Sequence, residues 1–171
     1  MGLEMLGAVD EAAVEQAVCL AAQSLEQLGR PWVLEVSHMG YLFGLFDALS
    51  VPETARPGLL VALRAKNIHE LRAAAAAAGL ESAGADALTA LLELSGDYAA
   101  VLPKAEALCR NARMREAAAE LRTLAAPLAQ AGGTARLDLT LAGEMEYYNG
   151  LVFQGYLRSL PRPLLKGGRY D

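Results

Sequence analysis

The sequence predicts an α+β fold, in which a sheet with flanking helices is interrupted by a helical insertion. Apolar residues recur at spacings of three and four over much of the first 133 residues, as they do in helices. The pattern then changes to strict alternation, as in strands. Of the 171 residues, 54% are hydrophobic and 20% are charged, so the chain can fill a packed core. We therefore assign residues 1–50 and 134–171 to one core and residues 51–133 to the helical insertion.

The first part of the chain predicts a helix, a strand and a second helix. Asp10 is a suitable N-cap for a helix that runs to Leu28, and Gly29 follows where helices often end. Residues 32–37 place Trp, Leu and Val on one face and Glu and Ser on the other, which is typical of a half-buried strand. Residues 41–49 are mostly apolar and predict a short helix.

The middle of the chain predicts one helix after another. Pro57 suits a first helical turn, and the alanine-rich run 73–78 has strong helix propensity. Asp86 and Asp97 are predicted helix starts, because aspartate caps helix N-termini. The longest predicted helix covers residues 113–130 and ends before two glycines.

The last of these helices carries charges of both signs. Acidic and basic residues are interleaved along it, which predicts a solvent-facing surface rather than a nucleic-acid-binding stripe. The residues concerned are Arg113, Arg115, Glu116, Glu120 and Arg122.

The last part of the chain predicts three strands. Residues 135–141 alternate without a break, residues 151–157 form a second run, and residues 164–171 form a third after a loop with two prolines. Residues 2–7 have the pattern of the end of a further strand. Because both ends of the chain fall on such segments, we expect it to be cut from a longer protein.

Composition and charge exclude several classes of protein. The net charge of −5 argues against binding to nucleic acid or to an anionic membrane, because both need a cationic surface. No run of 18 apolar residues is present, and the first residues lack the pattern of a secretory signal. Cys19 and Cys109 lie 90 residues apart and have no partner at metal-ligand spacing. We therefore expect a cytoplasmic protein with reduced thiols, no metal, no cofactor, and no nucleic-acid or membrane partner.

Three short segments combine glycines with carboxylates or tyrosines: residues 2–7, 144–150 and 167–171. Glycine lets the backbone approach a ligand closely, a carboxylate accepts hydrogen bonds, and a tyrosine hydroxyl donates or accepts them. A pocket with one carboxylate and two tyrosines suits a small zwitterion or a heteroaromatic ring better than a phosphate. Taken singly, these residues also fit structural roles, as surface carboxylates or core rings. His38 and His69 have no partner at ligand spacing, so we interpret them as structural.

Together, the three segments resemble histidyl-tRNA synthetases. Residues 144–153 and 167–171 resemble the two histidine-recognition segments of these enzymes, and residues 2–7 resemble the segment just after motif 2. The specific resemblance covers residues 2–49 and 134–171, whereas residues 51–133 match only as a helical insertion. It implies a class II aminoacyl-tRNA synthetase-like fold, an antiparallel sheet with flanking helices, of which this chain is a truncated central part.

The same resemblance implies a role for four side chains. Glu4 and Tyr148 match the positions that contact the imidazole ring of histidine in the synthetases. Tyr170 matches a tyrosine that lines the same pocket, and Met145 matches an apolar wall position. We therefore expect a histidine-like ligand at these residues.

One position departs from the synthetases. In those enzymes an Arg-Gly-Leu-Asp pattern precedes the double tyrosine, and the arginine assists amino-acid activation, whereas here Gly143 takes its place. A hydrogen atom cannot replace a guanidinium that stabilises developing charge. The chain therefore more closely resembles the regulatory subunits of ATP phosphoribosyltransferase, paralogues of the synthetases that lack aminoacylation activity. This resemblance implies no catalytic residue, a hetero-oligomer with the catalytic subunit in histidine biosynthesis, and feedback inhibition by histidine.

Two alternatives stay open at this point. The chain is also compatible with a fragment of a histidyl-tRNA synthetase catalytic domain, against which Gly143 argues. It is further compatible with a helical interaction module in which residues 51–133 contact a partner and the tyrosines only fill the core.

Overall fold

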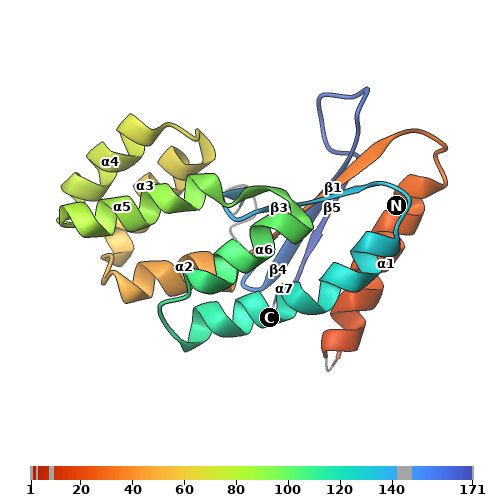
Figure 1. Cartoon of the computed structure of the whole chain (residues 1–171), viewed down its shortest axis with the longest axis horizontal. Coiled ribbons are helices and arrows are strands. Elements are labelled where there is room, and N and C mark those ends of the chain that lie inside the picture. The colour runs from red at the N-terminus through yellow and green to blue at the C-terminus, as the bar shows by residue number, and fades with distance from the viewer. Residues whose placement is uncertain (1, 3, 8–9, 142–147, 171) are drawn as a thin grey trace.

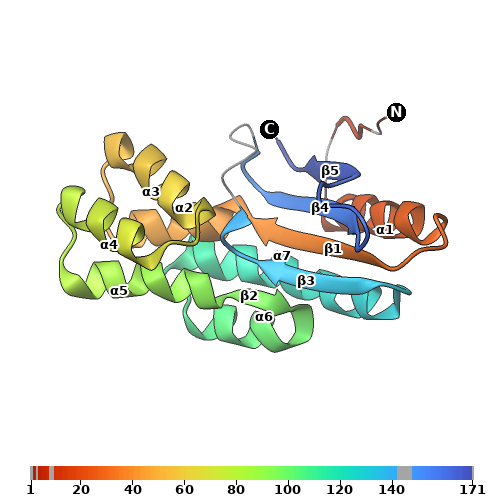
Figure 2. The same ribbon diagram turned by 90° about the horizontal axis from the view of Figure 1, so that it is seen from above.

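The chain folds into a five-stranded sheet with helices packed against it (Figure 1). This computed structural model describes residues 2, 4–7, 10–141 and 148–170. The strands are β1 (Trp32–His38), β2 (Ser95–Asp97), β3 (Thr134–Asp138), β4 (Leu151–Leu157) and β5 (Leu165–Gly168). Their order is β2-β3-β1-β4-β5, so β2 and β5 lie at opposite edges (Figure 2). Neighbouring strands are antiparallel except β1 and β3, which are parallel. The predicted α+β class is confirmed, and its mainly antiparallel sheet contains this one parallel pair.

The helices form two groups. Those that pack against the strands are α1 (Glu11–Glu26), α2 (Met39–Ala48), α6 (Tyr98–Ala107) and α7 (Ala112–Gln130). A separate cluster beside the sheet contains α3 (Arg56–Arg64), α4 (Ile68–Ala77) and α5 (Ser82–Ala90), with short 3-10 turns at Glu53–Ala55 and Leu91–Glu93 (Figure 1). None of the helices in the described ranges combines the length and apolar character needed to cross a membrane. The insertion at 51–133 thus contains helices of both groups, and its boundaries remain a prediction.

Local capping accounts for most of the predicted element ends. Asp10 caps α1 by accepting the N–H of Ala13 at 2.9 Å, and Asp97 caps α6 in the same way. The predicted helix to Leu28 ends earlier, at Glu26, and the chain then turns through Gly29, whose φ is +62°. The strand β4 has the predicted bounds.

Strand β3 is shorter than predicted. It ends at Asp138 and not at residue 141, because Asp138 accepts both the N–H of Thr140 at 2.9 Å and its hydroxyl at 2.6 Å. The N–H of Leu139 then donates to the carbonyl of Leu94 at 3.0 Å, away from the sheet ladder. A side chain that accepts a hydrogen bond from the backbone N–H two residues later competes with the strand's own hydrogen bonds. The alternation of apolar residues gives no sign of this competition.

Two expectations for the middle of the chain and one for its start were wrong. Asp86 lies inside α5 and begins no helix, and its carboxylate pairs with Arg72 of α4 at 2.6 Å. Strand β2 interrupts the predicted run of helices, because three residues are too few for a period of two to be visible. The described residues of the segment 2–7 belong to no strand.

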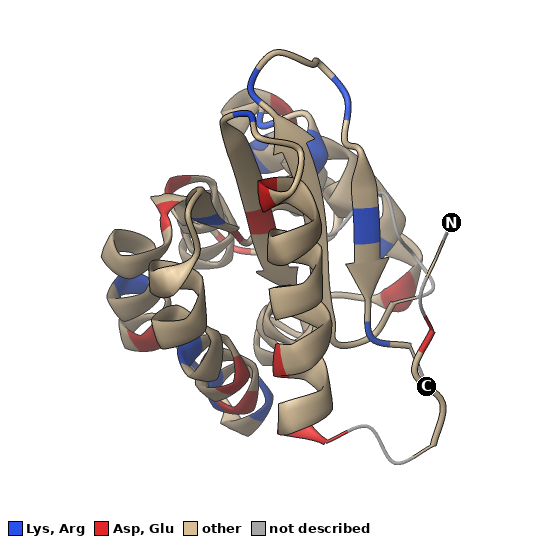
Figure 3. Ribbon diagram, turned by 90° about the vertical axis from the view of Figure 1, so that its right-hand side faces the viewer, with Lys and Arg blue, Asp and Glu red and all other residues tan. Residues whose placement is uncertain are grey.

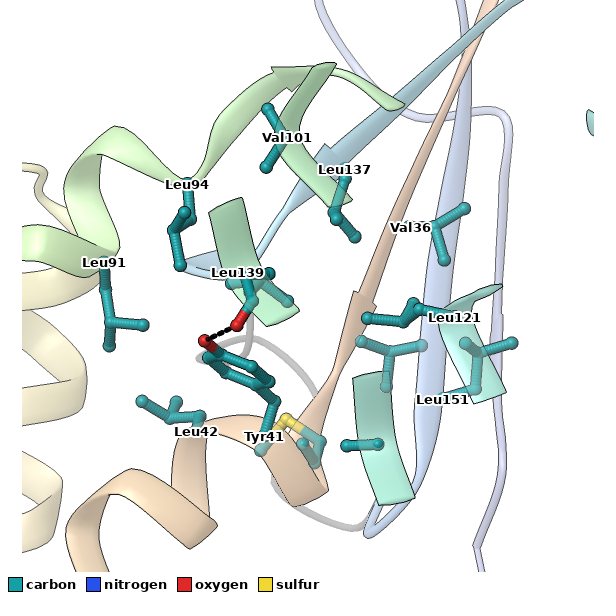
Figure 4. Packing of buried hydrophobic residues seen from close by; sticks show 14 of the residues in the cluster. Val36, Tyr41, Leu42, Leu91, Leu94, Val101, Leu121, Leu137, Leu139 and Leu151 are labelled. Atoms are coloured by element: carbon teal, nitrogen blue, oxygen red, sulfur yellow. Dashed lines mark hydrogen bonds between the residues drawn. The ribbon is translucent and has the colours of Figure 1, made fainter. Parts of the chain in front are cut away.

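The core holds α2 tightly against α6 and α7. The Tyr41 hydroxyl is buried and donates to the carbonyl of Ala105 at 2.7 Å, and burial raises the pKa of this tyrosine (Figure 4). A Cβ on Gly44 would lie 2.8 Å from the side chain of Met114, so glycine permits the close approach of the two helices. Asn111, which caps α7, donates to the carbonyl of Gly44 at 2.7 Å. These contacts fix α2 relative to α6 and α7.

Candidate functional site

Three of the predicted site residues lie together beyond the end of β5. The hydroxyl of Tyr170 donates to the carboxylate of Glu4, although 166 positions separate them in the sequence. The rings of Tyr148 and Tyr170 are tilted by 44°, with their centroids 6.2 Å apart. Tyr148 is 8% exposed and Tyr170 is 45% exposed, so the pair presents one buried ring and one accessible ring. The three side chains are neighbours, and their role as ligand contacts remains a prediction.

The backbone holds the segments before β4 and after β5 together. The N–H of Asn149 donates to the carbonyl of Arg169 at 3.1 Å, and the N–H of Arg169 donates to the carbonyl of Leu151 at 2.7 Å. A Cβ on Gly168 would lie 2.8 Å from both the Tyr148 ring and the carbonyl oxygen of Leu151. Any larger residue would therefore displace either the Tyr148 ring or the backbone at Leu151, and this gives the predicted glycine-rich segment a packing function.

A groove of about 1130 Å³ extends from these tyrosines between α1 and the strands β4 and β5. Its lining is largely apolar, and its polar residues include Glu4, the two tyrosines, Lys166 and Arg169. Figure 3 shows acidic but no basic segments on α1, and the sequence of this helix contains no Lys or Arg. Lys166 and Arg169 line the opposite side. The groove exceeds the range of about 300–1,000 Å³ that is usual for small-molecule sites, so one small ligand would fill only part of it.

Two predicted positions cannot be placed. Met145, the expected apolar wall, and Gly143, at the position of the synthetase arginine, both lie outside the described residues.

A second polar cluster, which the sequence analysis missed, joins β1, α7 and the segment after β5. One oxygen of the Glu120 carboxylate lies 2.7 Å from Nε2 of His38, and the other lies 3.4 Å from the Arg169 guanidinium. Nδ1 of His38 accepts the N–H of Gly40 at 3.0 Å, so this histidine caps α2. Because Nδ1 accepts, this pattern assigns the imidazole proton to Nε2, which donates it to Glu120.

The predicted solvent-facing surface of α7 is only partly correct. Arg113 and Arg122 form exposed ion pairs, as expected. Glu120, in contrast, turns toward the sheet, and its side chain is 24% exposed. The hydrogen bond from His38 lowers the pKa of Glu120, and the charge of Arg169 adds to this effect, against the opposing effect of burial. His38 and Glu120 are 82 positions apart, so no sequence spacing connects them, and the only local signal was a histidine at a strand–helix junction.

The arrangement suits the recognition of a small polar ring. The Glu4 carboxylate can accept an N–H, a tyrosine hydroxyl can donate or accept, and the tyrosine faces can stack on a planar group. Lys166 and Arg169 provide positive charge for a carboxylate in the same groove. Among the residues that the structure describes, no group of three or more His, Cys, Asp or Glu is arranged to hold a metal ion.

Comparison with known proteins places the chain in a family. Residues 1–171 match the family model described as histidyl-tRNA synthetase. The chain belongs to the histidyl-tRNA synthetase family. The predicted class II synthetase-like fold is thereby confirmed, since solved structures of this family share the architecture.

The curated relatives of this histidyl-tRNA synthetase family member include several ATP phosphoribosyltransferase regulatory subunits. Those from Polynucleobacter necessarius, Shouchella clausii and Thermus thermophilus are 33%, 36% and 34% identical to it. Each alignment covers 100% of this chain but only 45%, 44% and 46% of the respective relative. The chain thus spans about half the length of the curated relatives that it matches.

Solved structures of the family superpose well on this chain. An ATP phosphoribosyltransferase regulatory subunit/histidyl-tRNA synthetase from Bacillus halodurans gives a TM-score of 0.85 at 29% identity, covering 98% of this chain and 45% of that one. The ATP phosphoribosyl transferase (HisG:HisZ) complex from Thermotoga maritima gives 0.75 at 19% identity, covering 95% of this chain and 57% of that one. At this lower identity the second structure supports the fold alone.

Proposed function

We propose that this chain is part of a non-catalytic regulatory subunit of ATP phosphoribosyltransferase in histidine biosynthesis. The chain would assemble with the catalytic subunit, support its activity and take part in its feedback inhibition by histidine. The observation that carries this proposal is the group of relatives with this name, which match the whole chain at 33–36% identity. The same role fits a cytoplasmic location, which we propose with it.

We further propose that free histidine is the ligand of Glu4, Tyr148 and Tyr170, with Met145 as an apolar wall. The contact between Glu4 and Tyr170 and the tilted tyrosine pair give a carboxylate, a hydroxyl and ring faces at one place. These groups complement the N–H groups and the plane of an imidazole. Lys166 and Arg169 complement the carboxylate of the amino acid.

The absence of aminoacylation chemistry is proposed from Gly143. A glycine at the position of the synthetase arginine supplies no charge to a developing adenylate. Arg136, the arginine nearest before it in the sequence, lies on β3 with its guanidinium 3.8 Å from the carboxylate of Glu35. This partner on β1 supports the view that Arg136 does not replace the missing group.

One observation favours a second candidate, a histidyl-tRNA synthetase catalytic domain. The structure with a TM-score of 0.85 carries both names, regulatory subunit and histidyl-tRNA synthetase. Both candidates would use the proposed histidine pocket, and they differ in the chemistry performed beside it.

Enzyme assays on the whole protein that carries this chain separate the candidates. Phosphoribosyl transfer by a short-form ATP phosphoribosyltransferase catalytic subunit from the same organism is measured with and without the protein, and then with added histidine. Activity that depends on the protein and falls with histidine supports the regulatory role. No effect on that enzyme, together with histidine-dependent pyrophosphate exchange by the protein alone, establishes the synthetase.

The helical interaction module is tested by a Tyr148→Phe variant of the same protein. A changed histidine response in this variant supports the pocket. An unchanged response, with loss of assembly after disruption of the helices at 51–133, supports the module.

A further inference from the structure

We propose that Glu120 transmits occupancy of the histidine pocket to helix α2, through Arg169 on one side and His38 on the other. This proposal rests on the proposed function of the pocket. It adds a route by which the binding of histidine would affect the helices. Glu120 is a positioning residue in this route and does not itself contact the ligand.

The route begins at Tyr170, whose chain neighbour is Arg169. Both residues line the groove, and the backbone of Arg169 is held by Leu151 at 2.7 Å and by Asn149 at 3.1 Å. Because Arg169 itself lines the groove, a ligand bound beside Tyr170 acts on the Arg169 side chain directly and not through the fixed backbone. A ligand beside the accessible ring of Tyr170 therefore also meets Arg169, whose guanidinium contacts Glu120.

The next step is the carboxylate of Glu120. Its contact with Arg169 measures 3.4 Å, whereas a charge-assisted hydrogen bond to a carboxylate measures about 2.7–2.9 Å. Its contact with His38 already measures 2.7 Å. The Glu120 carboxylate thus has one close and one longer contact on its two oxygens, and any shift of Arg169 on ligand binding would redistribute the two contacts.

The last step runs from His38 into α2. Nδ1 of His38 accepts the N–H of Gly40 at 3.0 Å, which satisfies the first turn of the helix. A Cβ on Gly40 would lie 3.0 Å from the imidazole, so the ring packs closely on this turn. If a change in the contacts of Glu120 rotates the imidazole, the hydrogen bond from the Gly40 N–H in the first turn of α2 would therefore change as well.

Helix α2 also connects to the cluster of helices beside the sheet. Near its end, Asp47 accepts hydrogen bonds from Arg56 and from Arg113, each at 2.8 Å. These pairs join α2 to α3 and to α7. The route thus leads from the pocket through Arg169, Glu120 and His38 to α2, and along α2 to its ion pairs with α3 and α7. The quantity to be measured is the coupling free energy between the pocket and α2.

Hydrogen exchange and calorimetry on the whole protein that carries this chain test the route. Glu120→Gln keeps the size of the side chain and removes the charge, and Glu116→Gln makes the same change one turn earlier, at an exposed position of α7. Histidine affinity is measured by calorimetry, and amide exchange of the peptide that covers residues 39–46 is measured with and without saturating histidine. Without histidine, the difference between wild type and Glu120→Gln gives the purely structural effect of the change.

The expected result is a separation of binding from response. Histidine should slow exchange in the first turn of α2 by about fivefold or more in wild type and in Glu116→Gln, since allosteric couplings are typically of this size. Glu120→Gln should still bind histidine but lose most of this slowing. Equal slowing in both variants, or binding without any slowing in wild type, overturns the route while leaving the pocket in place. If wild type binds no histidine, the proposed ligand of the pocket is wrong and the route falls with it.

Discussion

Lys66 donates to the carboxylate of Asp138 at 2.5 Å and so joins the turn between α3 and α4 to the end of β3. The carboxylate is 6% exposed and accepts four hydrogen bonds, from Lys66, from Ser95 and from the N–H and hydroxyl of Thr140. The helices beside the sheet are therefore tied to it by a buried and fully bonded charge. A substitution that removes this charge therefore weakens or breaks the hydrogen bonds that the carboxylate accepts.

Asp138→Asn should lower the free energy of unfolding of the chain by about 2–3 kcal/mol, because the amide nitrogen cannot accept a hydrogen bond and either Lys66 and Ser95 or Thr140 lose their acceptor. Equilibrium unfolding in urea at neutral pH measures the difference. Asp86→Asn is the matched control, since Asp86 also pairs with one base, Arg72, but its side chain is 62% exposed. The control should change stability by less than about 0.5 kcal/mol. Equal losses in the two variants would show that burial of Asp138 contributes nothing.

Acid should destabilise the chain through Glu120 and Asp138. The hydrogen bond from His38 lowers the pKa of Glu120. Burial acts to raise the pKa of Asp138, but hydrogen bonds from Lys66 and Thr140 outweigh it and lower the pKa overall. A lowered pKa in the folded state means that the unfolded chain binds more protons. The resulting stability is complete above the ordinary carboxyl pKa of about 4 and is lost as the pH falls from there through the folded values.

Urea midpoints measured between about pH 7 and about pH 3 test this expectation. Wild type should lose stability on acidification, and Glu120→Gln and Asp138→Asn should each lose less, because each lacks one of the two carboxylates. A pH dependence that is identical in all three proteins would contradict the assignment of these two groups.

Much of the fold was predictable because the relevant forces are local. Asp10 and Asp97 cap helices with their own side chains, and the apolar run at 151–157 forms a strand with those bounds. The end of β3 was not predictable from alternation, because it depends on how Asp138 bonds Thr140. Strand β2 escaped prediction because only its pairing with β3 makes three residues a strand.

The candidate site was predictable only in part, for a related reason. Glu4 and Tyr170 could be assigned to one pocket from the family resemblance, since nothing in their local sequence brings positions 166 residues apart into contact. The sequence predicts that Glu120 faces solvent, because its neighbours along α7 are charged. Its contact with His38 depends on the packing of α7 against β1 and α2, which no periodicity of either segment describes.

Gly168→Ala should disturb the tyrosine pair. The added methyl would lie 2.8 Å from the ring of Tyr148 and from the carbonyl oxygen of Leu151, so one of them must move. We expect a loss of about 1–3 kcal/mol in the free energy of unfolding, as for other overpacked sites. Gly58→Ala is the control, because Gly58 lies in α3 and an added Cβ meets nothing within 4 Å. It should leave stability unchanged or raise it by up to about 1 kcal/mol, and a loss of similar size in both variants would refute the close approach at Gly168.

Tyr170→Phe should separate ligand recognition from stability. The hydroxyl that it removes donates to Glu4 on a side chain that is 45% exposed, so the free energy of unfolding should change little. Histidine affinity of the whole protein should fall about fivefold to tenfold, the equivalent of one hydrogen bond. Tyr98→Phe removes a buried hydroxyl that donates to the carbonyl of Leu121 at 2.7 Å; neither residue lines the groove, so this variant should show the opposite pattern. Calorimetric titration with histidine and urea unfolding of both variants measure the two quantities. Wild-type histidine affinity in Tyr170→Phe would remove this tyrosine from the proposed site. Its contact with Glu4 would then have a structural role only.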